Sequence, residues 1–162
     1  MNTRNKAVFF FFIYFALSVS AFAAETVRFK FVSPTLLGVG ETFQVQLHID
    51  PAGQDISEVP FVIGYDPAVI EVQSVKPGGF LVAGSLFNPS VDNVEGRIRV
   101  DVAPHNHEAK PQSDVLATVY FRVAQRFAST SIVGLTMAPV DTDGNGLPPD
   151  YPATLHIRNR SQ

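Results

Sequence analysis

Cysteine and tryptophan are both absent from the 162 residues of this chain. Without cysteine, the protein forms no disulfide and supplies neither a catalytic thiol nor a thiolate ligand for a metal ion. Its fold must therefore be stabilised by packing alone. Without tryptophan, it lacks the largest flat ring with which proteins stack on sugars, so we do not expect a flat aromatic strip for cellulose.

Long apolar runs are also absent, except at the amino terminus. Two basic residues precede an apolar run at residues 7–17, and small residues ending in Ala21-Phe22-Ala23 follow it. This order is typical of a secretory signal peptide, and the run is about half the ~20 residues that span a bilayer. We therefore expect a signal peptide at residues 1–23 and one domain at residues 24–162. The product should be exported to the periplasm or the extracellular space, with no membrane span after cleavage.

Acidic residues outnumber basic ones in the expected mature chain. After residues 1–23 are removed, ten Lys and Arg residues remain against 15 Asp and Glu residues, a formal net charge of −5. Because such a surface repels a phosphate backbone, we expect no nucleic-acid partner.

Three segments alternate apolar and polar residues without interruption, at residues 27–31, 42–50 and 97–102. A period of two is typical of a strand with one buried face. Six further strands are predicted between Pro, Gly, Asn or Asp residues, at 59–65, 69–75, about 85–91, 115–123, 131–137 and 153–157.

Helical periodicity is missing, because 12 prolines and 11 glycines interrupt the chain. Nine short strands with half-buried alternation favour an all-β fold in which two sheets pack face to face. We therefore predict a nine-stranded antiparallel β-sandwich or jelly roll.

No arrangement typical of an active site is found in the sequence. The acidic residues lie mostly in predicted turns or on solvent faces, and none are paired as glycoside hydrolysis requires. The Gly-x-Ser-x-Gly motif of a serine nucleophile is also missing. We expect a noncatalytic protein that requires no cofactor.

The segment DTDGNG, residues 141–146, is similar to the start of a calcium-binding EF-hand loop. Asp141, Asp143 and Asn145 would supply oxygen ligands at alternate positions. However, the twelfth position is Pro152 rather than a bidentate Glu, and the flanks are predicted strands. A structural calcium site and a tight turn without an ion are both compatible with these residues.

The segment PHNHEAKP, residues 104–111, places His105 and His107 in a predicted loop between the sixth and seventh strands. On extended backbone the two imidazoles would project to one side, where they could serve as ligands for zinc or copper. A polar surface loop explains the same residues, because no third histidine is nearby.

Four segments, taken in order, resemble the cohesin family. Gly40-Glu41-Thr42 begins an early strand, and Tyr65-Asp66-Pro67 forms a turn before the apolar IEVQSV strand. An Asn-x-x-Gly turn follows at residues 93–96, and the segment LATVYF begins at Leu116. The resemblance covers nearly all of the expected mature chain and implies a nine-stranded jelly roll.

The resemblance implies a noncatalytic receptor module that binds a dockerin or similar protein through one sheet face. It further implies a link to polysaccharide degradation. On our strand assignment, that face would present residues from the third and sixth predicted strands: Val62, Gly64, Arg97, Arg99 and Asp101.

Two alternative functions remain open. Cohesins are similar in fold to family 2 and family 3 carbohydrate-binding modules, so direct binding of polysaccharide is one alternative. The tyrosines available for it are Tyr65, Tyr120 and Tyr151, of which the alternation places Tyr65 in the core and Tyr120 facing outward. An accessory domain of the envelope or of a secretion apparatus, which pairs with another protein, is the other.

Overall fold

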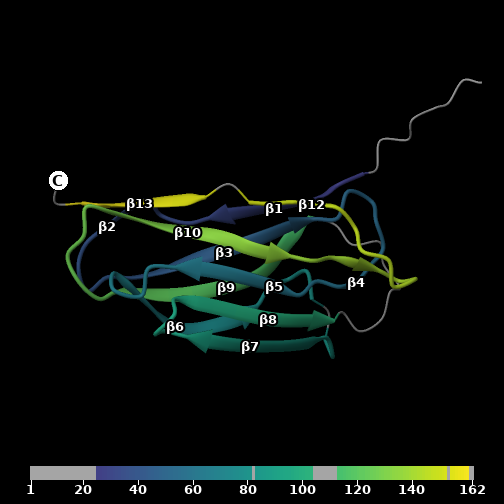
Figure 1. The fold of residues 1–162 in the computed structure, drawn as a ribbon, viewed down its shortest axis with the longest axis horizontal. Coiled ribbons are helices and arrows are strands. Elements are labelled where there is room, and N and C mark those ends of the chain that lie inside the picture. Colours follow the sequence, from purple (N-terminus) through teal and green to yellow (C-terminus); the bar gives the residue numbers. More distant parts are fainter. Residues whose placement is uncertain (1–24, 82, 104–112, 153, 161–162) are drawn as a thin grey trace, which may run out of the picture.

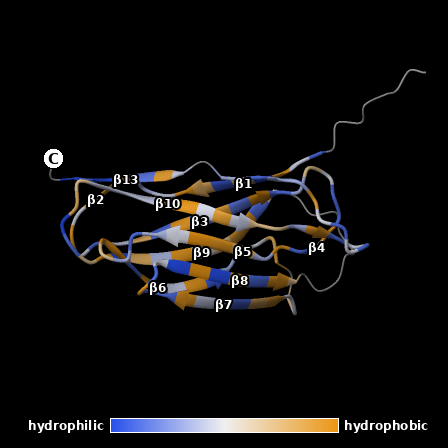
Figure 2. Ribbon diagram, in the orientation of Figure 1, coloured by the Kyte–Doolittle hydropathy of each residue, from blue (hydrophilic) through white to orange (hydrophobic). Residues whose placement is uncertain are grey.

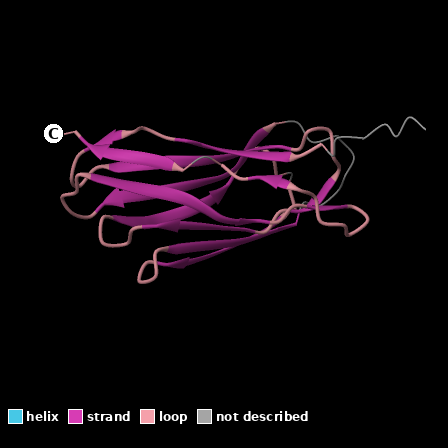
Figure 3. Cartoon of the chain, turned by 45° about the horizontal axis from the view of Figure 1, so that its top comes forward, coloured by secondary structure: helices cyan, strands magenta, loops and turns pink. Residues whose placement is uncertain are grey.

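Two β-sheets pack face to face, and no helix occurs, in the part of the chain that the computed structural model describes (Figures 1 and 3). That part comprises residues 25–81, 83–103, 113–152 and 154–160. The expected signal peptide lies outside it. The described residues include no helix long and apolar enough to cross a membrane.

The first sheet has five strands in the order β12-β1-β3-β9-β6. Antiparallel pairing joins β1 to β3, β3 to β9 and β9 to β6, whereas β12 runs parallel to β1. The strands are β12 (Pro149–Asp150), β1 (Val27–Val32), β3 (Thr42–Asp50), β9 (Asp114–Val123) and β6 (Ile70–Pro77).

The second sheet has six strands in the order β2-β13-β10-β5-β8-β7, and a separate pair is formed by β11 and β4. All its pairs are antiparallel except β2 with β13. The strands are β2 (Leu36–Leu37), β13 (Leu155–Asn159), β10 (Ser129–Met137), β5 (Phe61–Tyr65), β8 (Arg97–Ala103) and β7 (Leu86–Asp92), with β11 (Val140–Asp141) and β4 (Ile56–Glu58) as the separate pair.

The predicted all-β sandwich is confirmed, and each of the nine predicted strands corresponds to one long strand of the structure. The prediction was incomplete in one respect, because it omitted the short strands β2, β4, β11 and β12. It was wrong in another, since β2 and β12 pair in parallel and the sheets are not wholly antiparallel. Each of the four omitted strands has only two or three residues, too few to show alternation.

The core lies between the sheets and is built by the alternation seen in the sequence. In β3, Phe43, Val45, Leu47 and Ile49 are buried, while in β8 Ile98, Val100 and Val102 are buried between exposed charged residues. Figure 2 shows this alternation as orange and blue bands along β8. Burial of these side chains is the main contribution to stability, because no disulfide is available.

A polar bridge joins the sheets at one end of the sandwich. The Tyr65 hydroxyl donates to Asn93 Oδ1 at 2.6 Å, and the same oxygen accepts the Val72 backbone N–H at 3.0 Å. Tyr65 belongs to β5 of the second sheet, Val72 to β6 of the first, and Asn93 to the turn between β7 and β8. Burial, together with the carboxylates of Asp92 and Glu71, raises the pKa of Tyr65 to about 12. The phenol therefore stays protonated and keeps its donor at neutral pH.

Candidate partner-binding face

The outer side of strands β10, β5, β8 and β7, here called the docking face, brings together the residues predicted for partner binding. Val62 lies between Thr136 of β10 and Arg99 of β8 in the cross-strand register. One row away, Gly64 lies between Val133 and Arg97. The four strands are adjacent in this order, so the predicted residues lie on one continuous side of the sheet.

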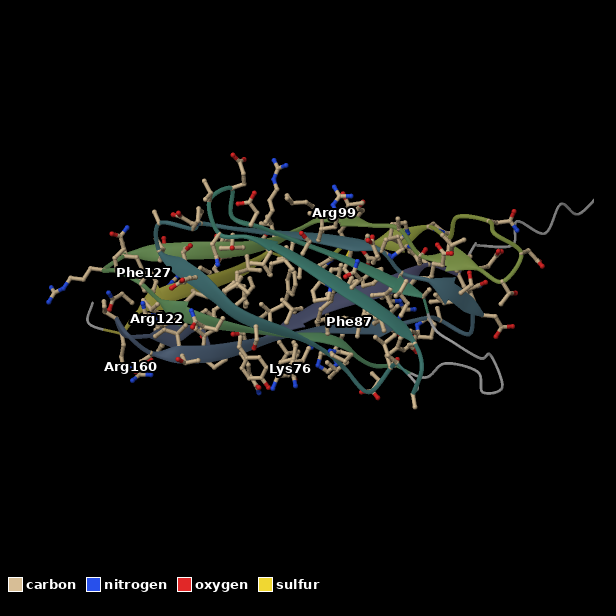
Figure 4. The ribbon with its side chains drawn as sticks, turned by 90° about the horizontal axis from the view of Figure 1, so that it is seen from below. Lys76, Phe87, Arg99, Arg122, Phe127 and Arg160 are labelled. Carbon is tan, nitrogen blue, oxygen red and sulfur yellow. The ribbon has the colours of Figure 1, made fainter. Side chains whose placement is uncertain are left out.

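The charged side chains of the docking face are exposed. Arg97, Arg99 and Asp101 alternate along β8 with buried residues, and they lie opposite residues of β7 that are also exposed. Among the described residues, neither arginine lies within 4.0 Å of a carboxylate in an ion pair. Figure 4 shows Arg99 on one side of the sandwich and Lys76 on the other. Arg97 lies opposite Asp92 of β7 and interacts with it electrostatically, but neither guanidinium is held in a close ion pair within the described part of the chain, so both can meet an acidic group on a partner.

Gly64 departs from its predicted exposure, because Leu135 covers it. A β-bulge between Gly134 and Thr136 changes the register of β10, so that Leu135 and Thr136 are both exposed. A Cβ placed on Gly64 would lie 3.0 Å from Leu135 Cδ1, and Gly64 itself is buried. The role of Gly64 is to let Leu135 lie flat over β5, and the sequence prediction missed Leu135 itself.

Leu135 is the apolar centre of the docking face. Its side chain is 46% exposed, and the half-buried Val133 and Val62 lie on the same outer surface. A depression of about 340 Å³ beside it is lined by Gly64, Arg97, Val133 and Leu135, among others. An apolar centre with charged residues at its margin is typical of a protein interface.

The predicted calcium residues lie together at the end of β11 and in the turn after it, but amide groups of this turn already hydrogen-bond to the Asp141 carboxylate. Asp141 Oδ1 accepts the backbone N–H groups of Asp143 at 2.9 Å and Asn145 at 2.7 Å, and Asn145 Nδ2 donates to Oδ2 at 3.1 Å. The hydrogen bonds from Asn145 come first among the causes that lower the pKa of Asp141. Within the described residues, no group of three or more His, Cys, Asp or Glu side chains is placed to hold a metal ion. The residues fit a self-contained turn better than a calcium site, which stays a prediction.

Removal of calcium should accordingly leave the melting temperature unchanged. A protein whose Asp141 oxygens are used by amide donors needs no cation at this turn. The measurement is thermal unfolding with EDTA and with excess calcium. Asp141→Ala serves as the control, because it should lower the melting temperature equally under both conditions. A rise in melting temperature with calcium that Asp141→Ala abolishes would instead establish the ion site.

The other predicted site residues have separate outcomes. His105 and His107 lie outside the described residues, so the zinc or copper site stays a prediction. Tyr65 is buried in the core as predicted. Tyr120 lies half-buried on the outer side of the first sheet, where the Lys76 ammonium is 5.2 Å from its ring centroid. Tyr151 is 48% exposed.

The two packed sheets and the exposed docking face define a β-sandwich binding module. The Cohesin domain family model matches residues 27–150. The chain therefore belongs to the cohesin family, whose members are noncatalytic binding modules, and the predictions of family and of a noncatalytic protein are confirmed.

Solved structures agree with this assignment of the fold. A type I cohesin–dockerin complex from Clostridium thermocellum aligns with a TM-score of 0.72 at 20% identity, covering 83% of this chain and 99% of that one. A type II cohesin from the cellulosome of Acetivibrio cellulolyticus gives 0.71 at 18% identity, with 82% and 95% covered. A non-cellulosomal cohesin from the archaeon Archaeoglobus fulgidus gives 0.65 at 22% identity, with 82% and 91% covered. A comparison with curated proteins gave no match.

Proposed function

We propose that this chain binds a dockerin-type protein partner through its docking face. The observation that carries the proposal is the exposed Leu135 beside Arg97 and Arg99, both free of ion pairs among the described residues. The apolar centre loses water on contact, and the guanidinium groups select an acidic partner surface. Similar cohesins have been solved in complex with dockerins, which supports a protein partner of this kind.

Export is part of the proposal. The basic residues, apolar run and Ala21-Phe22-Ala23 at the amino terminus are typical of a signal peptide, so the module would act in the periplasm or outside the cell. A role in polysaccharide degradation depends on what the partner carries. A dockerin attached to a polysaccharide-degrading enzyme would support that role, while an envelope protein without a dockerin would favour an accessory domain.

Charge reversal on the docking face is the test. The double variant Arg97→Glu/Arg99→Glu should weaken capture of purified dockerin modules from the source organism by at least about tenfold, because it removes charge complementarity. Titration calorimetry measures the affinity. A matched control, Lys76→Glu/Arg122→Glu, reverses two charges on the opposite sheet and should retain binding. Equal affinities for the two double variants would show that Arg97 and Arg99 do not contribute to the interface.

A further inference from the structure

A second hollow lies on the opposite sheet, away from the docking face. Its volume is about 770 Å³, within the ~300–1,000 Å³ range of small-molecule sites. It lies over β12, β1 and β3, and Ser113 and Tyr151 extend its wall. Neither the docking face nor any proposed partner residue contributes to it.

Opposite charges alternate across the strands that line this hollow. Arg28 of β1 is in register with Asp150 of β12 on one side and with Asp50 of β3 on the other. Arg28 Nη1 lies 3.6 Å from Asp50 Oδ2. In the next row, Lys30 is in register with His48. Neighbouring strands are about 4.8 Å apart, so donors and acceptors alternate over a row about 10 Å long.

Apolar groups complete the same hollow. The Tyr151 ring is 48% exposed and Val32 is 41% exposed, and both line it. The methylene stems of Arg28 and Lys30 add apolar area beneath their charged ends. The hollow therefore offers an aromatic ring and aliphatic surface beside a row of alternating charges.

His48 contributes an unsatisfied polar atom. Its Nε2 is buried and meets no hydrogen-bond partner among the residues described, although the side chain lines the hollow. Buried polar atoms without a partner are uncommon in folded proteins. An imidazole nitrogen can donate to or accept from a hydroxyl group, so a hydroxylated ligand would satisfy this atom once the ring turns Nε2 toward the hollow.

We propose that this hollow binds a neutral saccharide. A hydroxyl group can donate to a carboxylate and accept from a guanidinium or ammonium group, which is the alternation that Asp150, Arg28 and Asp50 provide. The C–H face of a sugar ring would lie on Tyr151. Two cations and two carboxylates line the hollow, so their charges balance and give a ligand of either net charge no overall electrostatic advantage over a neutral one. The module would then hold a sugar on one sheet and a protein on the other.

Tyrosine fluorescence and titration calorimetry can test this on the purified protein, with cellohexaose, xylohexaose and chitohexaose as probes. Tyr151→Ala should weaken binding of the preferred oligosaccharide by about tenfold or more, because the stacking surface is lost. Tyr151→Phe keeps the ring and should stay within about threefold of the unchanged protein. Tyr120→Ala removes a tyrosine from the same sheet outside the hollow and should leave the affinity unchanged.

The site proposal fails if none of the three oligosaccharides binds, or if Tyr151→Ala binds as well as the unchanged protein. Binding of an apolar dye in the hollow without any sugar binding would also overturn it, in favour of a lipid-like ligand. Its failure is distinguishable from that of the proposed function. The variant Arg97→Glu/Arg99→Glu should retain sugar binding, and Tyr151→Ala should retain dockerin binding.

Discussion

Replacing Phe121 with alanine is expected to lower the free energy of unfolding by about 3–5 kcal/mol, as large aromatic truncations in protein cores do. Phe121 is fully buried in β9. Its ring stacks on Phe43 of the same sheet and meets Tyr65 of the other sheet edge to face, each with centroids 5.4 Å apart. The truncation removes contacts within one sheet and between both. Because the free energy of unfolding of a domain is only about 5–15 kcal/mol, the substitution would remove a large part of the protein's stability.

Guanidinium unfolding followed by circular dichroism measures this loss. Tyr120→Ala is the matched control, because Tyr120 is the adjacent residue on β9 and its side chain lies on the outer side of the sheet. It should cost less than about 1 kcal/mol. If the Phe121→Ala protein is already unfolded, Phe121→Leu should still fold with a smaller loss, because leucine keeps more of the side-chain volume in the core. Equal losses for Phe121→Ala and Tyr120→Ala would contradict the central place of this ring.

The long strands were predictable because one buried face imposes a period of two on the sequence. Residues 42–50 were predicted as a strand and form β3 with the same bounds. The predicted strand at residues 59–65 begins later in the structure, at Phe61, since Pro60 lies just before it and lacks a backbone donor. Alternation thus located the strands, while their ends depended on local backbone chemistry.

The order of the strands in each sheet could not be predicted from alternation. Every half-buried strand has the same pattern, so the pattern does not say which strands are neighbours. The resemblance to cohesins supplied the docking face, and the register of β5 with β8 and β10 agrees with it. The bulge at Leu135 was missed, because an extra residue in one strand leaves no period-two signal.

The hollow on the opposite sheet was missed for a related reason. Alternation placed His48 and Asp50 on a solvent face, which is correct, but it gave no indication of what lies beside them. Arg28 and Asp150 are 122 positions apart and meet only because β12 pairs with β1. A two-residue strand in a Pro- and Gly-rich segment carries no sequence signal of that pairing.

Replacing Gly96 with alanine is expected to lower the free energy of unfolding by about 2–4 kcal/mol. Gly96 has a φ of +66°, a left-handed conformation that costs a side chain about 1–2 kcal/mol. A Cβ there would also collide with the carbonyl oxygen of Tyr65 and lie 2.7 Å from Pro67 Cδ. The turn must then shift, and with it the hydrogen bond from the Tyr65 N–H to the Gly96 carbonyl, now 2.9 Å.

A displaced turn should be visible at Tyr65 itself. The turn carries Asn93, which accepts the Tyr65 hydroxyl, so a shift should expose the phenol and bring its pKa down from about 12 toward the ordinary value near 10. Ultraviolet titration of the folded variant measures that fall. Gly144→Ala separates the effect of the left-handed conformation from that of the steric collision. Gly144 has a φ of +84°, but no atom lies within 4 Å of its Cβ position. It should cost only about 1–2 kcal/mol and leave the pKa of Tyr65 unchanged. The contrary outcome is that Gly96→Ala lowers the free energy of unfolding by no more than Gly144→Ala does. In that case the close approach of the turn to Tyr65 adds nothing to stability, and the polar bridge between the sheets does not depend on that approach.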